Sequence, residues 1–328
     1  MSTGISTNRN CESSATALKA AGLDFVFRYH SLRTKMPQKR LSPLEAATLA
    51  RAGLQVATVY QDNARLEADF GAARGREDAI AALTYAGQVG QPPGSAVYFA
   101  VDVDFSLKQL AAVVKPYFDA VVRAFADAGG GTPYLRVGVY GSGLTCRLVR
   151  QHVPGVTLTW LAEATAWRES SVYDGWNVRQ RVNTGHALGQ LGTAYEDCDG
   201  RDDFGQFQPV GFALTAGEGT LMRVVPGGGN IRWLPTTAFG DPIALLPPGQ
   251  RVNVLGASAP GWVRVRGADG ASVIGHMALS RLAALGAPAH APAAAPAPLP
   301  APALPVVPPA RMRENNPKAT RQSTTTYP

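Results

Sequence analysis

The sequence predicts an α/β protein with a (β/α)8 TIM-like barrel over residues 1–212, a small all-β domain at residues 217–286 and a disordered tail at residues 287–328. Three observations indicate this organisation. Short apolar segments alternate with helical patterns until about residue 210, which is typical of a parallel α/β fold. Residues 217–286 contain short strand patterns separated by turns rich in Gly and Pro, which indicates a small all-β domain. The tail is rich in Pro and Ala, with nine prolines among residues 287–310, and such a segment cannot build a packed core.

Eight strands and five helices are expected in the barrel. The strands are Gly4–Thr7, Asp24–His30, Gln55–Gln61, Ala96–Asp104, Arg136–Tyr140, Val156–Glu163, Asn177–Val182 and Ala194–Asp197. The helices are Glu12–Ala21, Leu44–Ala52, Gly75–Val89, Leu107–Ala128 and Gly143–Val153. Ser42, Pro43 and Glu45 form an N-cap, a first-turn proline and a capping-box glutamate for the second helix. The helical signal is poor after the sixth and seventh strands, so we expect that part of the barrel to be irregular.

The charge distribution argues against a nucleic-acid partner. The chain has 31 Lys and Arg against 24 Asp and Glu, a net charge of +7, and 45% of its 328 residues are hydrophobic. Residues 311–328 hold four basic side chains and one acidic side chain, so +3 of the +7 lies in the tail. No basic stripe with interleaved aromatic residues is present, which makes a nucleic-acid site unexpected. No apolar run that is free of proline reaches roughly 18 residues, so no membrane span is expected either.

Cysteine and histidine spacing predicts neither a metal site nor a cofactor. The three cysteines are far apart without a C-x-x-C pair, and no two of the five histidines have the spacing of metal ligands. Disulfide frameworks and zinc sites need such spacings.

The first residues also lack the charged and apolar regions of an export signal. We therefore expect synthesis in the cytoplasm.

The sharpest chemical signal is the pair Asp102 and Asp104 at the end of the fourth strand. Alternation along that strand places both carboxylates on the face opposite Val101 and Val103. A parallel barrel has its site at the carboxyl ends of its strands. Two neighbouring carboxylates on one face do not ionise independently, so the pKa of at least one of them should be raised, as a general acid requires. The structural alternative is that Asp104 caps the following loop while Asp102 bonds Arg28.

Glycoside hydrolysis usually needs a second carboxyl group across the bond that is cut. Glu163 follows the sixth strand, and the acidic run Glu196–Asp199 offers Asp197 and Asp199 as further catalytic candidates, with a solvated acidic loop as the alternative. Aromatic rings stack on sugars, and polar side chains at the same strand ends hydrogen-bond them, although each aromatic residue could equally belong to the core. The candidate substrate-binding residues are Arg28, Tyr60, Gln61, Tyr98, Tyr140, Trp160 and Gln180.

Cys146 is the rival nucleophile. It lies near the start of a predicted helix, where the helix dipole lowers a thiol pKa. His152, its nearest histidine in sequence, falls roughly on the opposite face of that helix. A buried structural thiol is the alternative for Cys146.

Several segments together resemble a known family. They are Ala21–Tyr29, Leu41–Ala46, Tyr98–Asp104 and Val137–Ser142, with Arg74, Gly75 and Asp78 between them. In this order they are similar to the glycoside-hydrolase-like family catalogued as domain of unknown function 1906. The resemblance covers about residues 2–210. It implies a (β/α)8-like barrel related to the lysozymes of glycoside hydrolase family 25, which cut the glycan strands of peptidoglycan.

Two positions depart from the patterns of these relatives. The lysozymes carry Asp-x-Glu where this chain has Asp102 and Asp104, and family members commonly have Gly-Phe-Asp where this chain has Gly4, Ile5 and Ser6.

A second resemblance is carried by Asn230–Arg232, Val252–Gly256 and Gly261–Val265, which are similar to a bacterial Src-homology-3-like (SH3-like) domain. Such modules often attach wall hydrolases to peptidoglycan.

The sequence therefore predicts a peptidoglycan-directed, lysozyme-like glycosidase with a wall-targeting module. Asp104 is the expected general acid, Asp102 the expected stabilising carboxylate, and Glu163 or Asp197 and Asp199 the groups that handle water. Action at the wall or periplasm then requires non-classical export, for example as a secreted effector with a secretion-apparatus or immunity partner. The alternative is a non-catalytic glycan-binding or scaffold protein that retains the barrel without the chemistry.

Overall fold

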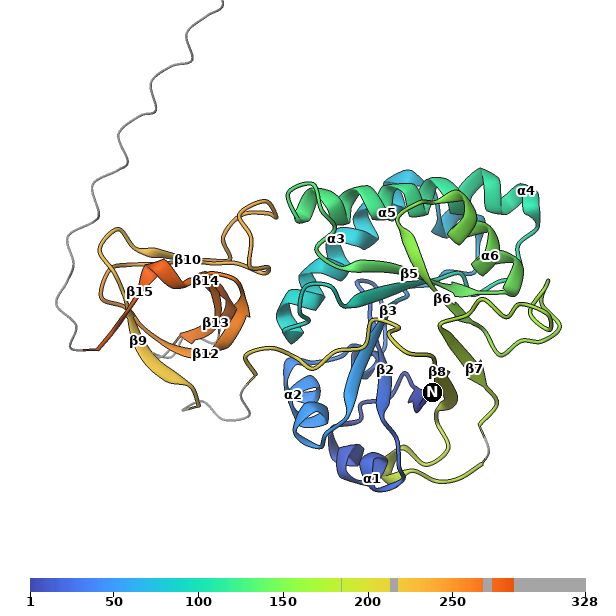
Figure 1. Cartoon of the computed structure of the whole chain (residues 1–328), viewed down its shortest axis with the longest axis horizontal. Helices are drawn as coiled ribbons and strands as arrows, with labels where there is room; N and C mark the ends of the chain where they lie inside the picture. The colour runs from blue at the N-terminus through green and yellow to red at the C-terminus, as the bar shows by residue number, and fades with distance from the viewer. Residues whose placement is uncertain (184, 213–217, 268–272, 286–328) are drawn as a thin grey trace, which may run out of the picture. The chain divides into compact units, whose positions relative to one another are not determined.

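The fold is described from a computed structural model that covers residues 1–183, 185–212, 218–267 and 273–285. The predicted disordered tail at residues 287–328 lies outside the described residues. Eight strands close into a barrel in the order of the chain (Figure 1). They are β1 (Ser2–Ser6), β2 (Phe25–His30), β3 (Gln55–Tyr60), β4 (Ala96–Ala100), β5 (Arg136–Gly141), β6 (Val156–Leu161), β7 (Val178–Arg181) and β8 (Glu196–Gly200).

The closed eight-stranded barrel confirms the predicted fold class, but the barrel is not wholly parallel. Strands β1 to β7 run parallel to their neighbours, whereas β8 is antiparallel to both β7 and β1. In the register, Ser6 at the carboxyl end of β1 pairs with Glu196 at the start of β8. A parallel crossover usually needs an intervening helix, and residues 182–195 supply only one 3-10 turn in their described part. This connection reverses the chain direction, so Glu196 and not Asp199 lies at the open end.

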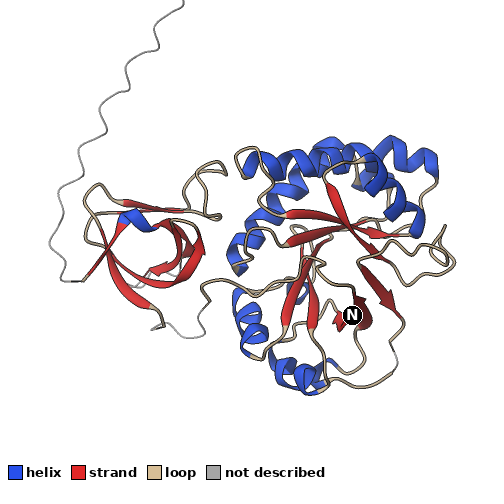
Figure 2. Ribbon diagram, viewed as in Figure 1, coloured by secondary structure: helices blue, strands red, loops and turns tan. Residues whose placement is uncertain are grey.

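The helices pack outside the barrel (Figure 2). They are α1 (Ala15–Ala20), α2 (Pro43–Arg51), α3 (Ala72–Val89), α4 (Leu107–Gln109), α5 (Lys115–Ala128) and α6 (Gly143–His152), with a π-helical turn at Leu110–Val114. Ser42 Oγ accepts a hydrogen bond from Glu45 N at the start of α2, as the capping signal predicts. The described residues after β6 and β7 form no α-helix, which agrees with the poor helical signal there. None of the described helices is long and apolar enough to cross a membrane.

The lower part of the barrel interior is filled with aromatic side chains. Phe27 stacks on Trp160 at a centroid distance of 4.1 Å, and Tyr98 donates a hydrogen bond to Phe204 O at 2.8 Å. A Cβ added at Gly138 would lie 2.5 Å from the Tyr98 ring, so only glycine fits there. In the described part of the barrel interior, these aromatic side chains leave no room for a ligand at this level.

A fully buried ion pair fastens the first loops of the barrel to α2. Arg28 Nε donates to Glu45 Oε1 at 2.6 Å, and neither side chain is exposed. The remaining guanidinium nitrogens donate to Thr7 O at 2.6 Å and Gln38 O at 2.8 Å. Cys11 N also donates to Glu45 Oε1, at 2.7 Å. The pair thus joins segments that border the open end of the barrel.

The regular elements among the described residues after the barrel are strands and one 3-10 turn, as the turn spacing predicts. Their core contains Val224, Ile231, Val252, Val265 and Met277. The SH3-like identity of this segment and its boundary with the barrel stay predictions. The strands are β9 (Thr220–Val224), β10 (Gly229–Ile231), β11 (Ala244–Leu246), β12 (Arg251–Ala259), β13 (Trp262–Gly267), β14 (Ile274–Ala278) and β15 (Leu282–Ala284), in a five-stranded sheet of order β14-β13-β12-β9-β15 and a β10-β11 pair.

Candidate active site

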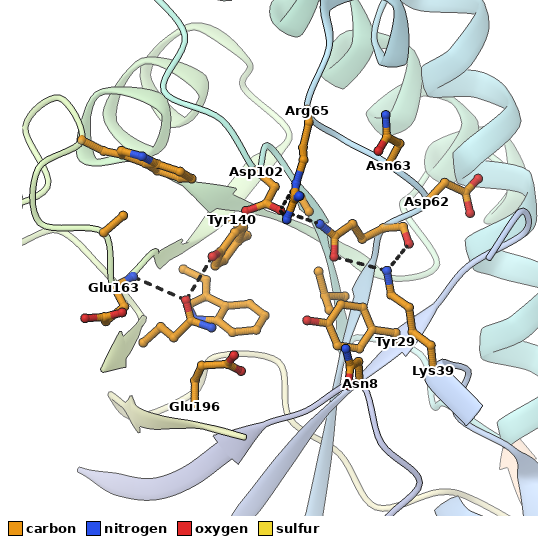
Figure 3. Close-up of a pocket in the computed structure, with 17 residues that line it drawn as sticks. Asn8, Tyr29, Lys39, Asp62, Asn63, Arg65, Asp102, Tyr140, Glu163 and Glu196 are labelled. Atoms are coloured by element: carbon orange, nitrogen blue, oxygen red, sulfur yellow. Dashed lines mark hydrogen bonds and ion pairs between the residues drawn. The ribbon is translucent and has the colours of Figure 1, made fainter. Parts of the chain in front are cut away.

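A cavity of about 540 Å³ opens at the carboxyl ends of the parallel strands (Figure 3). Most of its lining side chains are polar or aromatic, and they come from all the strands or from the loops that follow them. Parallel barrels concentrate polar side chains at this end. The lining residues are Asn8, Tyr29, Lys39, Val59, Gln61, Asp62, Asn63, Arg65, Ala100, Asp102, Tyr140, Trp160, Glu163, Ala164, Trp167, Gln180 and Glu196.

Asp102 lies in the loop after β4 and is held as an ion pair. Arg65 donates to its Oδ2 through Nε at 2.9 Å, and Gln61 Nε2 donates to the same oxygen at 3.2 Å. The Asp102 side chain is 18% exposed and that of Arg65 is 69% exposed. Asp102 is therefore accessible from the cavity, beside a cation that a ligand can displace.

A chain of hydrogen bonds crosses the cavity floor from Tyr140 to Glu196. Tyr140 OH donates to Gln180 Oε1 at 3.0 Å, and Gln180 Nε2 donates to Ser6 Oγ at 3.2 Å. Ser6 Oγ in turn donates to Glu196 Oε2 at 3.0 Å. Ser6 occupies the position where the resembling family commonly has a carboxylate. The acid that lies at this point of the mouth is instead Glu196, from β8.

The pKa of Glu196 is raised above its usual value of 4.5. The main cause is partial desolvation by the cavity wall, which disfavours the charged form although the residue is exposed to the cavity, and the neighbouring carboxylates of Glu163 and Asp102 raise the pKa further. The hydrogen bond from Ser6 acts in the opposite direction because it stabilises the carboxylate. One cavity thus contains an ion-paired aspartate and a glutamate whose pKa is raised.

Half of the predicted site residues line this cavity: Asp102, Glu163, Gln61, Tyr140, Trp160 and Gln180. Trp160 forms part of the floor, with its ring 4.8 Å from that of Tyr140. Their predicted catalytic and substrate-binding roles stay predictions.

The predicted pairing of Asp102 with Asp104 in one site is not found. Strand β4 ends at Ala100, so the alternation that placed both acids on one face stops before either of them. Asp104 instead accepts hydrogen bonds from Arg168 Nη1 at 2.8 Å and Arg168 N at 3.1 Å, and it does not line the cavity. The alternative in which Asp102 bonds Arg28 is also excluded, because Arg28 pairs with Glu45.

Asp197 and Asp199 also lie away from the cavity lining. Alternation along β8 points them to the side of the strand opposite Glu196. Asp199 forms ion pairs with Arg179 at 2.8 Å and Arg181 at 3.0 Å. The acidic run therefore contributes only its first member to the mouth.

Three predicted substrate-binding residues are not on the cavity surface. Arg28 is turned toward α2 and uses its donors on Glu45 and backbone carbonyls. Tyr60 faces the same outer side of the sheet and donates to Asp62 Oδ2 at 3.0 Å. Tyr98 points inward but lies in the aromatic layer below the cavity.

Sequence reasoning missed several lining residues as site candidates, among them Tyr29, Lys39, Arg65 and Glu196. Alternation could have identified Tyr29, since Phe25 and Phe27 on the same strand already point inward. Lys39 ends a short 3-10 turn (Pro37–Lys39) and Arg65 lies in a loop, and neither segment has a periodic pattern that indicates direction.

Cys146 lies buried in α6, with Sγ donating to Trp160 O at 3.5 Å. Burial raises its pKa to about 12, and backbone hydrogen bonds oppose this only in part. His152 is exposed at the end of the same helix. The structural-thiol alternative therefore holds, and Cys146 has no environment that would activate it as a nucleophile.

Burial of the thiols predicts that the folded protein resists alkylation. Cys11, Cys146 and Cys198 are all free and buried. At pH 8 iodoacetamide should leave all three unmodified for an hour in the native protein and modify all three in guanidinium chloride, as measured by intact-mass spectrometry. Modification of native Cys146 at the rate of a free thiol would contradict this placement.

Comparison with known proteins gives the same fold and names a family. The profile of the Rv2525c-like, glycoside hydrolase-like domain matches residues 16–208. A curated relative, the uncharacterized protein YbfG of Bacillus subtilis, is 33% identical over 115 residues, which are 34% of this chain and 15% of YbfG. The uncharacterized protein FadG of the same organism is 30% identical over 139 residues, 41% of this chain and 23% of FadG. The chain thus spans less than a quarter of either relative.

Among solved structures, the Tat-secreted protein Rv2525c of Mycobacterium tuberculosis, in complex with L-tartrate, aligns with a TM-score of 0.52. It is 22% identical, and the alignment covers 62% of this chain and 98% of that one. A glycosyl hydrolase 25 of Streptococcus pneumoniae aligns more distantly, with a TM-score of 0.44 and 10% identity over 61% of this chain and 87% of that one. The matched family profile spans more than half of the sequence, so the chain belongs to the Rv2525c-like glycoside hydrolase-like family.

Proposed function

We propose that the barrel hydrolyses the glycan strands of peptidoglycan at the cavity between Asp102 and Glu196. The single observation that carries the proposal is the contrast between these two groups, one ion-paired with Arg65 and one with a raised pKa, in the same cavity. Glycosidases use such a pair, because one carboxyl group must donate a proton while another stays ionised. Membership of a glycoside hydrolase-like family supports the same reaction class.

In this proposal Glu196 is the general acid. Ser6 donates to Oε2, so the proton of the acid form resides on Oε1. That proton moves to the glycosidic oxygen as the bond to the anomeric carbon breaks, and Asp102 stabilises the positive charge that develops on the sugar. Glu163 accepts a proton from the water that adds to the anomeric carbon. Return of this proton to Glu196 completes the cycle.

Export and wall targeting remain proposals of the same kind. In this account residues 217–286 form an SH3-like module that holds the barrel on peptidoglycan, and the protein reaches the wall by non-classical export. A secreted effector of this type would be matched by an immunity or secretion partner. The SH3-like module and its wall-binding role rest on the sequence resemblance.

A second candidate function is glycan binding without hydrolysis. One observation favours it: Asp104, which stands where the related lysozymes have the second acid of Asp-x-Glu, is paired with Arg168 outside the cavity. The cavity and its aromatic floor would then serve only for recognition.

Incubation of the full chain with purified sacculi distinguishes the two candidates. Hydrolysis predicts loss of turbidity and release of soluble glycan fragments, whereas binding alone predicts that the protein sediments with intact sacculi. If the protein neither solubilises sacculi nor sediments with them, both candidates fail.

A further inference from the structure

Lys39 places a half-buried positive charge at one side of the cavity. Its ammonium group donates to Gln61 O at 3.0 Å and approaches Gln61 Oε1 at 3.4 Å. It also lies 4.6 Å from the centroid of the Tyr29 ring, a cation–π contact. These contacts fix the position of the charge without neutralising it.

No carboxylate among the described residues lies within 4 Å of Lys39 Nζ as an ion-pair partner. The two nearby acids, Asp62 and Asp102, are already paired with Arg33 at 3.2 Å and Arg65 at 2.9 Å. Burial lowers the pKa of Lys39, and the more distant charges of Asp62 and Asp102 oppose that shift. Because a partly desolvated cation is costly without a counter-ion, an anionic ligand group beside Lys39 would be stabilised.

The cavity is asymmetric in charge. Lys39, Tyr29 and Asn8 lie on one side of it, and Glu163 lies on the opposite side (Figure 3). A ligand with an anionic group is therefore favoured in the orientation that places this group beside Lys39 and away from Glu163. A neutral glycan can accept a hydrogen bond from the ammonium group, but it forms no ion pair with it.

We propose that the Lys39 side of the cavity is a subsite for a carboxylate carried by a sugar of the bound glycan. This inference rests on the proposed function and narrows its substrate class to acidic glycans. In peptidoglycan the matching group is the lactyl carboxylate of a muramic acid from which the peptide has been removed. A uronic acid presents the same chemistry from a different carbon.

Binding of three tetrasaccharides to the full chain tests the subsite. Chitotetraose is neutral, a peptide-free N-acetylglucosamine–N-acetylmuramic acid tetrasaccharide carries lactyl carboxylates, and a hyaluronan tetrasaccharide carries uronate carboxylates. Isothermal titration calorimetry at low salt gives each Kd. We expect the muramic tetrasaccharide to bind about tenfold more tightly than chitotetraose, the size of one charge-assisted hydrogen bond.

Lys39→Met should remove this preference, and a circular dichroism spectrum that matches that of wild type shows that the variant is folded. Lys39→Arg should retain part of the preference. Lys35→Met is the matched control, because Lys35 is exposed in the same segment and does not line the cavity. It should bind all three tetrasaccharides as wild type does.

The outcomes separate this inference from the proposed function. Equal binding of neutral and acidic tetrasaccharides by wild type, or an unchanged preference in Lys39→Met, overturns the subsite and leaves the proposed function standing. Preference for hyaluronan over the muramic tetrasaccharide supports a carboxylate subsite but contradicts peptidoglycan as its source. Binding of none of the three overturns both proposals.

Discussion

Glu196→Gln is expected to lower the initial rate of peptidoglycan solubilisation by at least about 100-fold, the range in which a positioned general acid contributes. The amide keeps the size of the side chain and can still accept the hydrogen bond from Ser6, but it has no proton to give to the glycosidic oxygen. Folding should be unaffected, because the Glu196 side chain is exposed to the cavity. The measurement is the rate of fragment release at fixed protein concentration.

Asp197→Asn is the matched control for this substitution. It removes one carboxylate from the same strand at the next residue, on the side that does not line the cavity. Its rate should stay within about twofold of wild type. Equal losses of rate in the two variants would mean that the reaction requires the negative charge of β8 in general and not a proton on Glu196.

The pH dependence of wild-type activity should show the titration of Glu196. A general acid works only while protonated, so activity is present below the folded pKa of Glu196 and is lost as pH rises through it. Because that pKa is raised, the alkaline limb of kcat/KM should lie above the usual glutamate value of 4.5. A limb at or below pH 4.5 would argue against Glu196 as the acid.

Glu45→Gln is expected to destabilise the protein by about 3 kcal/mol, because it leaves the Arg28 guanidinium buried without a counter-charge. Both side chains of this pair are fully buried, and Glu45 also accepts from Cys11 N. Urea unfolding followed by circular dichroism measures the change in the free energy of unfolding.

Glu77→Gln serves as its control, since Glu77 also pairs with an arginine, Arg33, but is 47% exposed. Exposed pairs contribute little, so this change should stay below about 1 kcal/mol. A cost for Glu45→Gln as small as that of Glu77→Gln would show that the buried pair does not anchor the loops at the barrel mouth.

Short apolar runs were sufficient to predict the strands, because the strands of a barrel covered by helices are buried on both faces. The sequence pattern carries no direction, however, and the reversal of β8 depends on a connection without a helix. That reversal decides which acid of the run reaches the mouth, and so Glu196 was recognised only as part of a run. Asp104 was misplaced for a related reason, since alternation was extended past Ala100 into a loop.

The loop residues of the site could not be predicted from periodicity. Lys39 and Arg65 come from connections after β2 and β3, and their positions depend on contacts with Gln61 and Asp102. Arg28 was expected at the mouth because it is polar and near a strand end. Its partner Glu45 was identified only as a capping residue, although the same carboxylate neutralises Arg28.

Mass spectrometry of borohydride-reduced peptidoglycan digests tests the central claim most directly. Wild type should generate new reduced sugar ends, and the identity of the reduced sugar distinguishes cleavage after muramic acid from cleavage after glucosamine. The Asp102→Asn/Glu196→Gln double variant should generate none, while Asp104→Asn should generate the wild-type products. Identical products from wild type and the double variant, or no new ends from wild type, would contradict hydrolysis at this cavity.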